Sequence, residues 1–279
     1  MRKSLAARLL RNRSGAVGLI LIVIFLTAGL CGVFGLLPYS PDAQHVRDRL
    51  QGSGAHYVMG TDEFGRDVFS RVVRGATNSL RVAVISVAVS GLLGTMLGTV
   101  AGYFGGALDL IIMRFMDLLF AFPAILLALA IVAALGPGDR NTILAISIVY
   151  LPIFARVARG PVLAVRETEF VTAARCTGAT DARILGRHVL PNITAPLIVQ
   201  VSLALSWAIL TEAGLSFLGL GVQPPEPSWG SMLSQSRQLM ELAPWLAVFP
   251  GLAIMLCVLG FNLLGDGLRD ALDPRLRGY

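Results

Sequence analysis

The chain has 279 residues, of which 55% are hydrophobic and only 14% charged. Soluble domains carry about 25% charged residues, so this composition argues against a water-soluble globular protein and favours a membrane protein. The formal net charge of +6 needs no nucleic acid to explain it, because membrane proteins concentrate basic residues on one side of the bilayer.

Long stretches without charged residues recur along the chain. A helix needs about 20 apolar residues to cross the hydrocarbon, and lipid satisfies no backbone groups, so each crossing should be an α-helix. The fourth stretch is the shortest and needs Arg140 and Arg156 to reach out from its ends. We therefore expect an all-α polytopic membrane protein with about six transmembrane helices, at roughly 15–37, 78–103, 108–135, 140–158, 195–215 and 245–266.

The N-terminal tail sets the expected topology. Its five basic residues resemble a signal peptide, but the apolar run that follows is too long for one, so we expect an uncleaved first helix. Basic residues favour the cytoplasm, which predicts that both termini are cytoplasmic and that 38–76 and Gly219–Pro244 lie outside. The basic residues are Arg2, Lys3, Arg8, Arg11 and Arg13.

Small residues mark the expected packing of the helices. Gly94, Gly98, Gly102 and Gly106 recur at a spacing of four, which places one glycine face on the second helix. Such a face lets a neighbouring helix approach closely, although lining a pore is an alternative role. Pro123 should kink the third helix.

Charged residues near the spans need a physical reason, because they are costly there. Asp109, Arg114 and Asp117 open the third helix as an expected interfacial anchor, in which Arg114 and Asp117 can pair. Glu212 near the outer end of the fifth helix either faces a water-filled path or lies at the interface. Cys31, Cys176 and Cys257 have no metal or disulfide spacing.

Several absences bear on function. Lys3 is the only lysine, so the chain contains no GxxxxGK[ST] phosphate loop, and the three histidines are far apart in sequence. We expect no catalytic site, metal or cofactor in this chain, and hence no enzyme. The central parts of the spans are almost free of charge, which disfavours proton coupling and favours a pathway driven by a partner.

The most informative loop is residues 167–191, on the expected cytoplasmic side. Its residues predict a helix, a break at Gly178 in the left-handed conformation, and a second helix that begins near Thr180 and Asp181 and ends at Pro191. Such an element is suited to dock into a cleft on another protein. An ordinary amphipathic loop is the alternative.

Four segments resemble binding-protein-dependent ATP-binding-cassette (ABC) importer permeases. The loop resembles their EAA motif, with Thr172 standing where the motif has Glu. The other three segments resemble the dipeptide/oligopeptide/nickel group, in its C-type subunit. The matching residues are Thr172–Ala174, Gly178 and His188–Pro191 in the loop, then Gly60–Arg71, Glu212–Gly230 and Asn262–Arg275.

The resemblance implies one MetI-like transmembrane domain of a type I importer in the inner membrane of a bacterium. It implies residues 1–76 as tail, first helix and extracytoplasmic segment, and 77–279 as the permease core, with a coupling loop at about 161–193. The implied partners are a second permease, two ATPase subunits or domains that bind ATP and Mg, and an extracytoplasmic solute-binding protein.

The resemblance also assigns candidate site residues. The expected substrate is a dipeptide or oligopeptide, with nickel, glutathione or haem as alternatives; an ion-gradient-driven transporter and a membrane scaffold or sensor are alternatives of other classes. Trp229 beside Pro224–Pro227 is expected to form a stiff outer surface. The ATPase-coupling candidates are Glu169, Thr172, Ala173, Ala174, Gly178, Ala179, Asp181, Leu190 and Pro191, and the binding-protein or pathway candidates are Asp62, Arg66, Asp67, Glu212 and Trp229.

Overall fold

A computed structural model describes residues 9, 10 and 12–272. The basic residues Arg2, Lys3, Arg8 and Arg11 and the resemblance at Asp273–Arg275 therefore lie outside the described residues. The described part is nearly all helical, with one isolated bridge between Thr61 and Asp67. Within residues 9, 10 and 12–272, five helices are long and apolar enough to cross a membrane, and a bent pair makes a sixth crossing if it counts as one span, which confirms the expected fold class.

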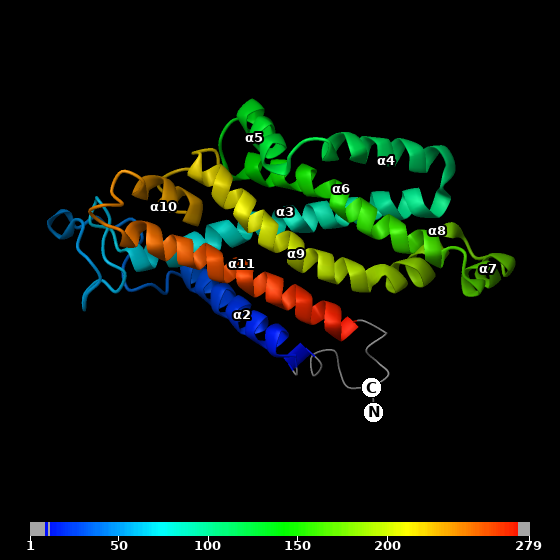
Figure 1. Cartoon of the computed structure of the whole chain (residues 1–279), viewed down its shortest axis with the longest axis horizontal. Helices are drawn as coiled ribbons and strands as arrows, with labels where there is room; N and C mark the ends of the chain where they lie inside the picture. The colour runs from blue at the N-terminus through cyan, green and yellow to red at the C-terminus, as the bar shows by residue number, and fades with distance from the viewer. Residues whose placement is uncertain (1–8, 11, 273–279) are drawn as a thin grey trace.

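Apart from the second half of the bent pair, which stands across it, the spans run roughly along the long axis of the molecule (Figure 1). Residues 38–67 and α10 lie at one end, and α7 lies at the other (Figure 1). The spanning helices are α2 (Arg13–Phe34), α3 (Val68–Phe104), the pair α4 (Gly106–Phe120) and α5 (Ala124–Leu135), α6 (Asp139–Val165), α9 (Leu190–Phe217) and α11 (Trp245–Leu272). The shorter elements are η1 (Val46–Asp48), α7 (Glu169–Cys176), α8 (Asp181–Ile184), the π-helical turn η2 (Leu185–Val189) and α10 (Trp229–Ser236).

Two expected helix boundaries differ from the structure. The second helix begins ten residues earlier than expected, because Asp67 caps it by accepting a hydrogen bond from the Ser70 backbone N–H at 2.8 Å. This earlier start was missed because charged residues in the first turns of the helix interrupt the apolar run. The kink expected at Pro123 is a full break, where α4 and α5 meet at 89°.

The glycine face of α3 packs against α6, as predicted. A side chain on Gly98 would collide with the Ala155 carbonyl, and a Cβ on Gly94 would lie 2.7 Å from the Leu151 carbonyl oxygen. Gly102 also faces α6, whereas Gly106 lies beyond the end of α3 with a φ of +58°. Close backbone approach, rather than lining a pore, explains the first three glycines.

Glycines also attach the first span to the rest of the molecule. A Cβ on Gly18 of α2 would lie 2.8 Å from the Gly260 carbonyl oxygen of α11, and Gly15 packs directly against Gly267. The side-chain amide of Asn12 donates to Asp270 at 2.8 Å near the same place. The start of α2 and the end of α11 are therefore held side by side (Figure 1).

The α3–α6 contact can be tested with two glycines that face different surroundings. Gly98→Ala should lower the free energy of unfolding by about 1–3 kcal/mol, because the new methyl group overpacks the interface. Gly160→Ala on α6 is the matched control, since nothing lies within 4 Å of its added carbon. Thermal unfolding of the purified protein in detergent measures both. Equal melting temperatures for the two variants would contradict this packing.

Candidate functional site

The first half of the loop 167–191 has the predicted helix–glycine form. α7 ends in a Schellman turn, in which the Gly178 N–H donates to the Arg175 carbonyl and the Ala179 N–H to the Ala174 carbonyl, both at 3.0 Å. Gly178 has a φ of +79°, which a residue with a side chain rarely adopts. The chain therefore reverses sharply at Gly178.

The second half of the loop corrects one expectation. Pro191 does not end the second helix, because α8, η2 and α9 follow one another without a break. The π turn makes this continuity possible: the Leu190 N–H donates to the Leu185 carbonyl, five residues back, just before the proline. Thr180 occupies the capping position of α8, but its side chain makes no capping hydrogen bond.

A small separate core fixes the loop to the ends of α3 and α6. Its members are apolar side chains of the loop, of α9 and of those two helix ends, and nearly all are fully buried. Ala174 and Ala179 of the loop pack against this core. The buried members are Tyr103, Ala158, Val162, Val171, Ile184, Val189 and Ile193.

Polar contacts reinforce this attachment. The Tyr103 hydroxyl at the end of α3 donates to Asp181 of α8 at 2.6 Å, and the Arg175 guanidinium lies 5.2 Å from the centre of the Tyr103 ring. Arg166 donates to the Gly102 carbonyl at 2.7 Å. The loop is thus joined to the ends of two spanning helices and should move with them.

The opposite side of the loop is exposed. Glu169, Thr172, Ala173 and Gly178 are all exposed on or just after α7, at the end of the molecule (Figure 1). Leu190 and Pro191 are exposed at the start of α9, on the other arm of the loop. Ala174 and Ala179 are the coupling candidates that pack inward, whereas Asp181 is exposed and is held by the Tyr103 hydroxyl.

The binding-protein or pathway candidates Asp62 and Asp67 make internal contacts in this arrangement. Asp62 is buried, accepts hydrogen bonds from the Phe64 and Arg66 backbones at 2.9 Å, and pairs with the Arg66 side chain at 2.6 Å. Asp67 is buried as the cap of α3. These buried carboxylates hold their segment in place rather than forming an exposed contact surface.

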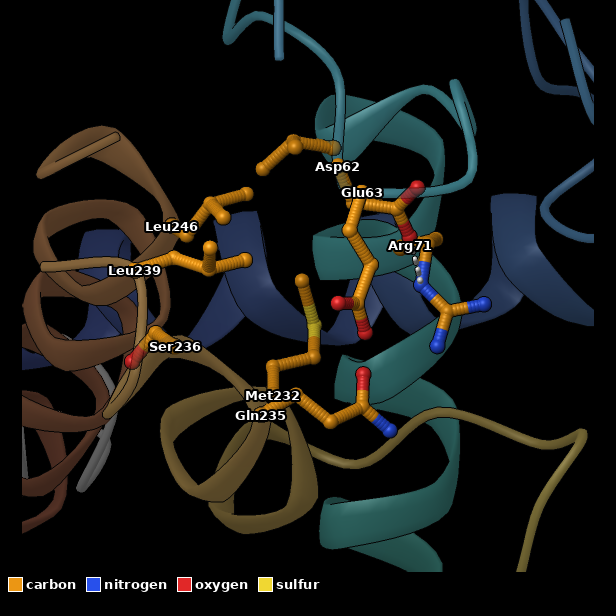
Figure 2. Close-up of a pocket in the computed structure, with 9 residues that line it drawn as sticks. Asp62, Glu63, Arg71, Met232, Gln235, Ser236, Leu239 and Leu246 are labelled. Atoms are coloured by element: carbon orange, nitrogen blue, oxygen red, sulfur yellow. Dashed lines mark ion pairs between the residues drawn. The ribbon is translucent and has the colours of Figure 1, made fainter. Parts of the chain in front are cut away.

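Arg71 lies behind this turn and is nearly fully buried (Figure 2). Its guanidinium is 3.8 Å from Asp62 and 3.6 Å from Asp42, and it donates to the Pro41 carbonyl at 3.2 Å. The cavity beside it has a volume of about 20 Å³, which holds about one water molecule. This cavity is too small to be a substrate site.

Trp229 is the clearest correction at the outer end. Its side chain is fully buried, its indole N–H donates to the Val72 carbonyl at 3.0 Å, and its ring meets Phe25 edge-on at 5.5 Å. The expected stiff surface formed by Trp229 is therefore wrong. Ser228 and Ser231 cap α10 reciprocally, and this Ser-x-x-Ser pattern around Trp229 was the signal in the sequence that a helix begins there.

Glu212 is buried as well, so neither of its expected positions is correct. Glu212 belongs to α9 and its side chain is fully buried. One of its carboxylate oxygens accepts a hydrogen bond from the Ser216 hydroxyl at 2.6 Å. The other oxygen has no hydrogen-bond partner among the described residues. The side chain lies neither at the interface nor on a described cavity.

An ionic cluster at the outer end was not predicted. Arg74 of α3 makes two bonds to Glu226, at 2.9 and 2.8 Å, and also donates to the Gly32 carbonyl of α2 at 3.0 Å. Asn78 donates to Glu226 at 2.9 Å. The hydrogen bond from Arg74 is the main reason that the pKa of Glu226 falls to about 2. No local pattern reveals a pair 152 residues apart.

Comparison with known proteins places this architecture in a family. Residues 94–278 match the model of the binding-protein-dependent transport system inner membrane component, and the chain belongs to that family. It resembles inward-facing structures of the MetNI methionine ABC transporter, with a TM-score of 0.58 at 18% identity over 73% of this chain and 97% of the other. That likeness supports the MetI-like fold.

Individual relatives are similar over nearly the whole chain. The dipeptide transport system permease protein DppC of Alkalihalophilus pseudofirmus is 50% identical, over 97% of this chain and 88% of its own length. The glutathione transport system permease protein GsiD of Pectobacterium atrosepticum is 47% identical, over 94% and 87%. The di/tripeptide permease DppC of Pseudomonas aeruginosa is 46% identical, over 95% and 90%.

The expected class is confirmed by these matches. The chain is a multi-pass inner-membrane permease component of an ABC importer, a transport component and not the ATPase, and such a permease works with ATPase and solute-binding partners.

Trp229→Ala should destabilise the protein rather than affect a surface. Removing a fully buried tryptophan costs about 3–5 kcal/mol, and Trp229→Phe should cost less because it keeps part of the ring. Thermal unfolding and the yield of monodisperse protein in detergent measure the effect. A Trp229→Ala variant with the melting temperature of the wild type would contradict the buried position of the Trp229 side chain.

The Glu226 cluster predicts acid sensitivity of the outer end. Because the folded pKa of about 2 is below the ordinary value of 4.5, this carboxylate stabilises the fold above about pH 4.5 and loses that contribution as the pH falls toward 2. Glu226→Gln should therefore flatten the fall in melting temperature on the acid side. Glu63→Gln is the control, since Glu63 forms no ion pair among the described residues. Identical acid profiles for wild type and Glu226→Gln would refute the assignment.

Proposed function

We propose that this chain forms half of the translocation pathway of a type I importer for short peptides. A second, similar permease forms the other half, two ATPase subunits or domains bind ATP and Mg, and a solute-binding protein delivers the substrate. Closure of the ATPases rocks the two halves between outward-facing and inward-facing states, as a population shift driven by a partner. This chain itself supplies no catalysis and no cofactor.

The coupling loop carries the proposal. It projects at one end of the molecule, exposes Thr172, Ala173 and Gly178, and is fixed to α3 and α6 by a core and by Tyr103. A force on its outer side reaches the spanning helices without first deforming a flexible linker. We infer that an ATPase receives the α7–Gly178 end in a groove.

The topology follows from the same contact. If the loop meets an ATPase, its end of the molecule is cytoplasmic, and the start of α2 and the end of α11 lie on that side (Figure 1). This agrees with the expectation of two cytoplasmic termini.

Short peptides are the best-supported substrate class. The names of three relatives at 46–50% identity refer to dipeptides, di/tripeptides and glutathione, which is itself a modified tripeptide. Glutathione is therefore the second candidate substrate. The names of these relatives favour short peptides and glutathione over nickel or haem.

The outer segments 38–67 and 219–244 remain our proposed contact with the solute-binding protein. The residues that the sequence suggested for this contact are mostly buried or bonded within the chain, so other side chains must meet the solute-binding protein. Val46, Val58 and Phe64 are 67, 66 and 43% exposed at this end and offer apolar surface to a partner.

Docking of the loop can be tested at Ala173. Ala173→Arg adds bulk and charge to the exposed face and should reduce both copurification of the ATPase and substrate-stimulated ATP hydrolysis by about tenfold or more. Ala173→Ser is the matched control and should behave like the wild type. Labelled dipeptide uptake by the reconstituted complex should fall in parallel.

Gly178 gives an independent check of the same loop. Gly178→Val strains the left-handed turn, whereas Gly178→Asn fits it better, so only the valine variant should lose coupling. Normal ATPase retention and stimulated hydrolysis in both Ala173→Arg and Gly178→Val would overturn the docking assignment.

A further inference from the structure

The cytoplasmic loop contains a positively charged hollow on the concave side of its bend. This basic hollow has a volume of about 340 Å³ and is lined by Thr177 and Gly178 on one arm and by Arg183, Arg187 and His188 on the other. Its lining contains no acidic side chain. The hollow opens beside the exposed α7 face that the proposed function assigns to the ATPase.

The two arginines are unpaired. Arg183 and Arg187 are exposed, and neither forms an ion pair with any described residue. Of the acids in the same loop, Glu167 pairs with Arg166 at 2.8 Å and Asp181 accepts the Tyr103 hydroxyl, while Glu169 lies on α7 outside the lining of the hollow. Two like charges on one hollow repel each other, and an acidic group placed between them relieves that repulsion.

The two arginine side chains determine which chemical group fits the basic hollow. Each guanidinium presents a planar fork of donors that matches a carboxylate in two parallel bonds. The Gly178 turn leaves open space above the hollow, because nothing lies within 4 Å of a side chain added there. A short acidic side chain on a protruding segment can therefore enter between the two arms.

A protein partner fits the position better than a lipid headgroup. α7 and the bend lie at the extreme end of the molecule, past the ends of α4 and α11 (Figure 1). Headgroups lie where spanning helices end, whereas this hollow lies where a soluble subunit meets the loop. Thr172 also stands where the EAA motif has a carboxylate, and the charged side chains that line the hollow itself are basic.

We propose that the basic hollow binds an Asp or Glu side chain of the ATPase subunit, held between Arg183 and Arg187. This inference rests on the proposed function and specifies its chemistry: the ATPase groove carries the acid, and the permease carries the bases. The ionic contact orients the loop in the ATPase groove, and the exposed face of α7 fills that groove.

The experiment uses the assembled complex. Arg183→Glu/Arg187→Glu should reduce copurified ATPase at about 0.15 M salt by about tenfold or more, and Arg183→Lys/Arg187→Lys by much less. Wild-type retention should weaken as salt screens the contact. Arg269→Glu, an exposed arginine on α11 at the same end, is the matched charge-reversal control. Changing the partner acid of the ATPase to Arg should restore retention to the reversed variant.

The outcomes separate this inference from the proposed function. If Ala173→Arg abolishes ATPase retention while the double reversal leaves it normal, docking stands and the ionic contact is wrong. If the double reversal instead abolishes binding to vesicles rich in anionic lipid and leaves ATPase retention normal, the hollow is a lipid site. If neither Ala173→Arg nor the double reversal affects retention, the proposed function itself fails. A double reversal that lowers the melting temperature more than Arg269→Glu would show a folding defect and would also overturn the inference.

Discussion

The close approach of α3 and α6 is the contact on which the rest of the structure depends. In lipid, apolar side chains gain little from leaving their surroundings, so helices associate where small residues let backbones meet. Gly94, Gly98 and Gly102 provide that contact along one face of α3. α3 also carries the Arg74–Glu226 ion cluster at one end, and both helices hold the loop 167–191 at the other, so their packing determines where that loop is placed.

This arrangement makes the loop an extension of the membrane domain. The core around Val171 and Ile184 continues from α3 and α6, and Tyr103 joins the last turn of α3 to Asp181. The π turn before Pro191 then passes directly into α9. Three spanning helices therefore meet at one small element, and a displacement of that element is shared among them.

Hydrophobic runs and glycine spacing were sufficient to predict the spanning helices, the glycine face of α3 and the turn at Gly178, because each depends on local sequence, whereas the helix that meets that face was not predicted. The burial of Trp229 and Glu212 was not predictable, since it depends on α10 folding back onto distant helices. Arg114 likewise looked like the partner of Asp117, yet Arg156 of α6 pairs with Asp117 at 2.7 Å. Local spacing identifies a possible pair but not the competing residue that packing brings closer.

The positions of the ion pairs bear on how transport is driven. Among the described residues they cluster toward the two ends of the bundle, as with Arg159–Asp109 at 2.6 Å near the loop and Arg74–Glu226 at the outer end. Glu212 is enclosed without a charged partner and lies on no described cavity. A relay of protons needs ionisable groups spaced along a wet path, and this bundle has them at its ends instead. We therefore propose that the force for transport enters through a surface, and that the loop joined to α3, α6 and α9 receives it.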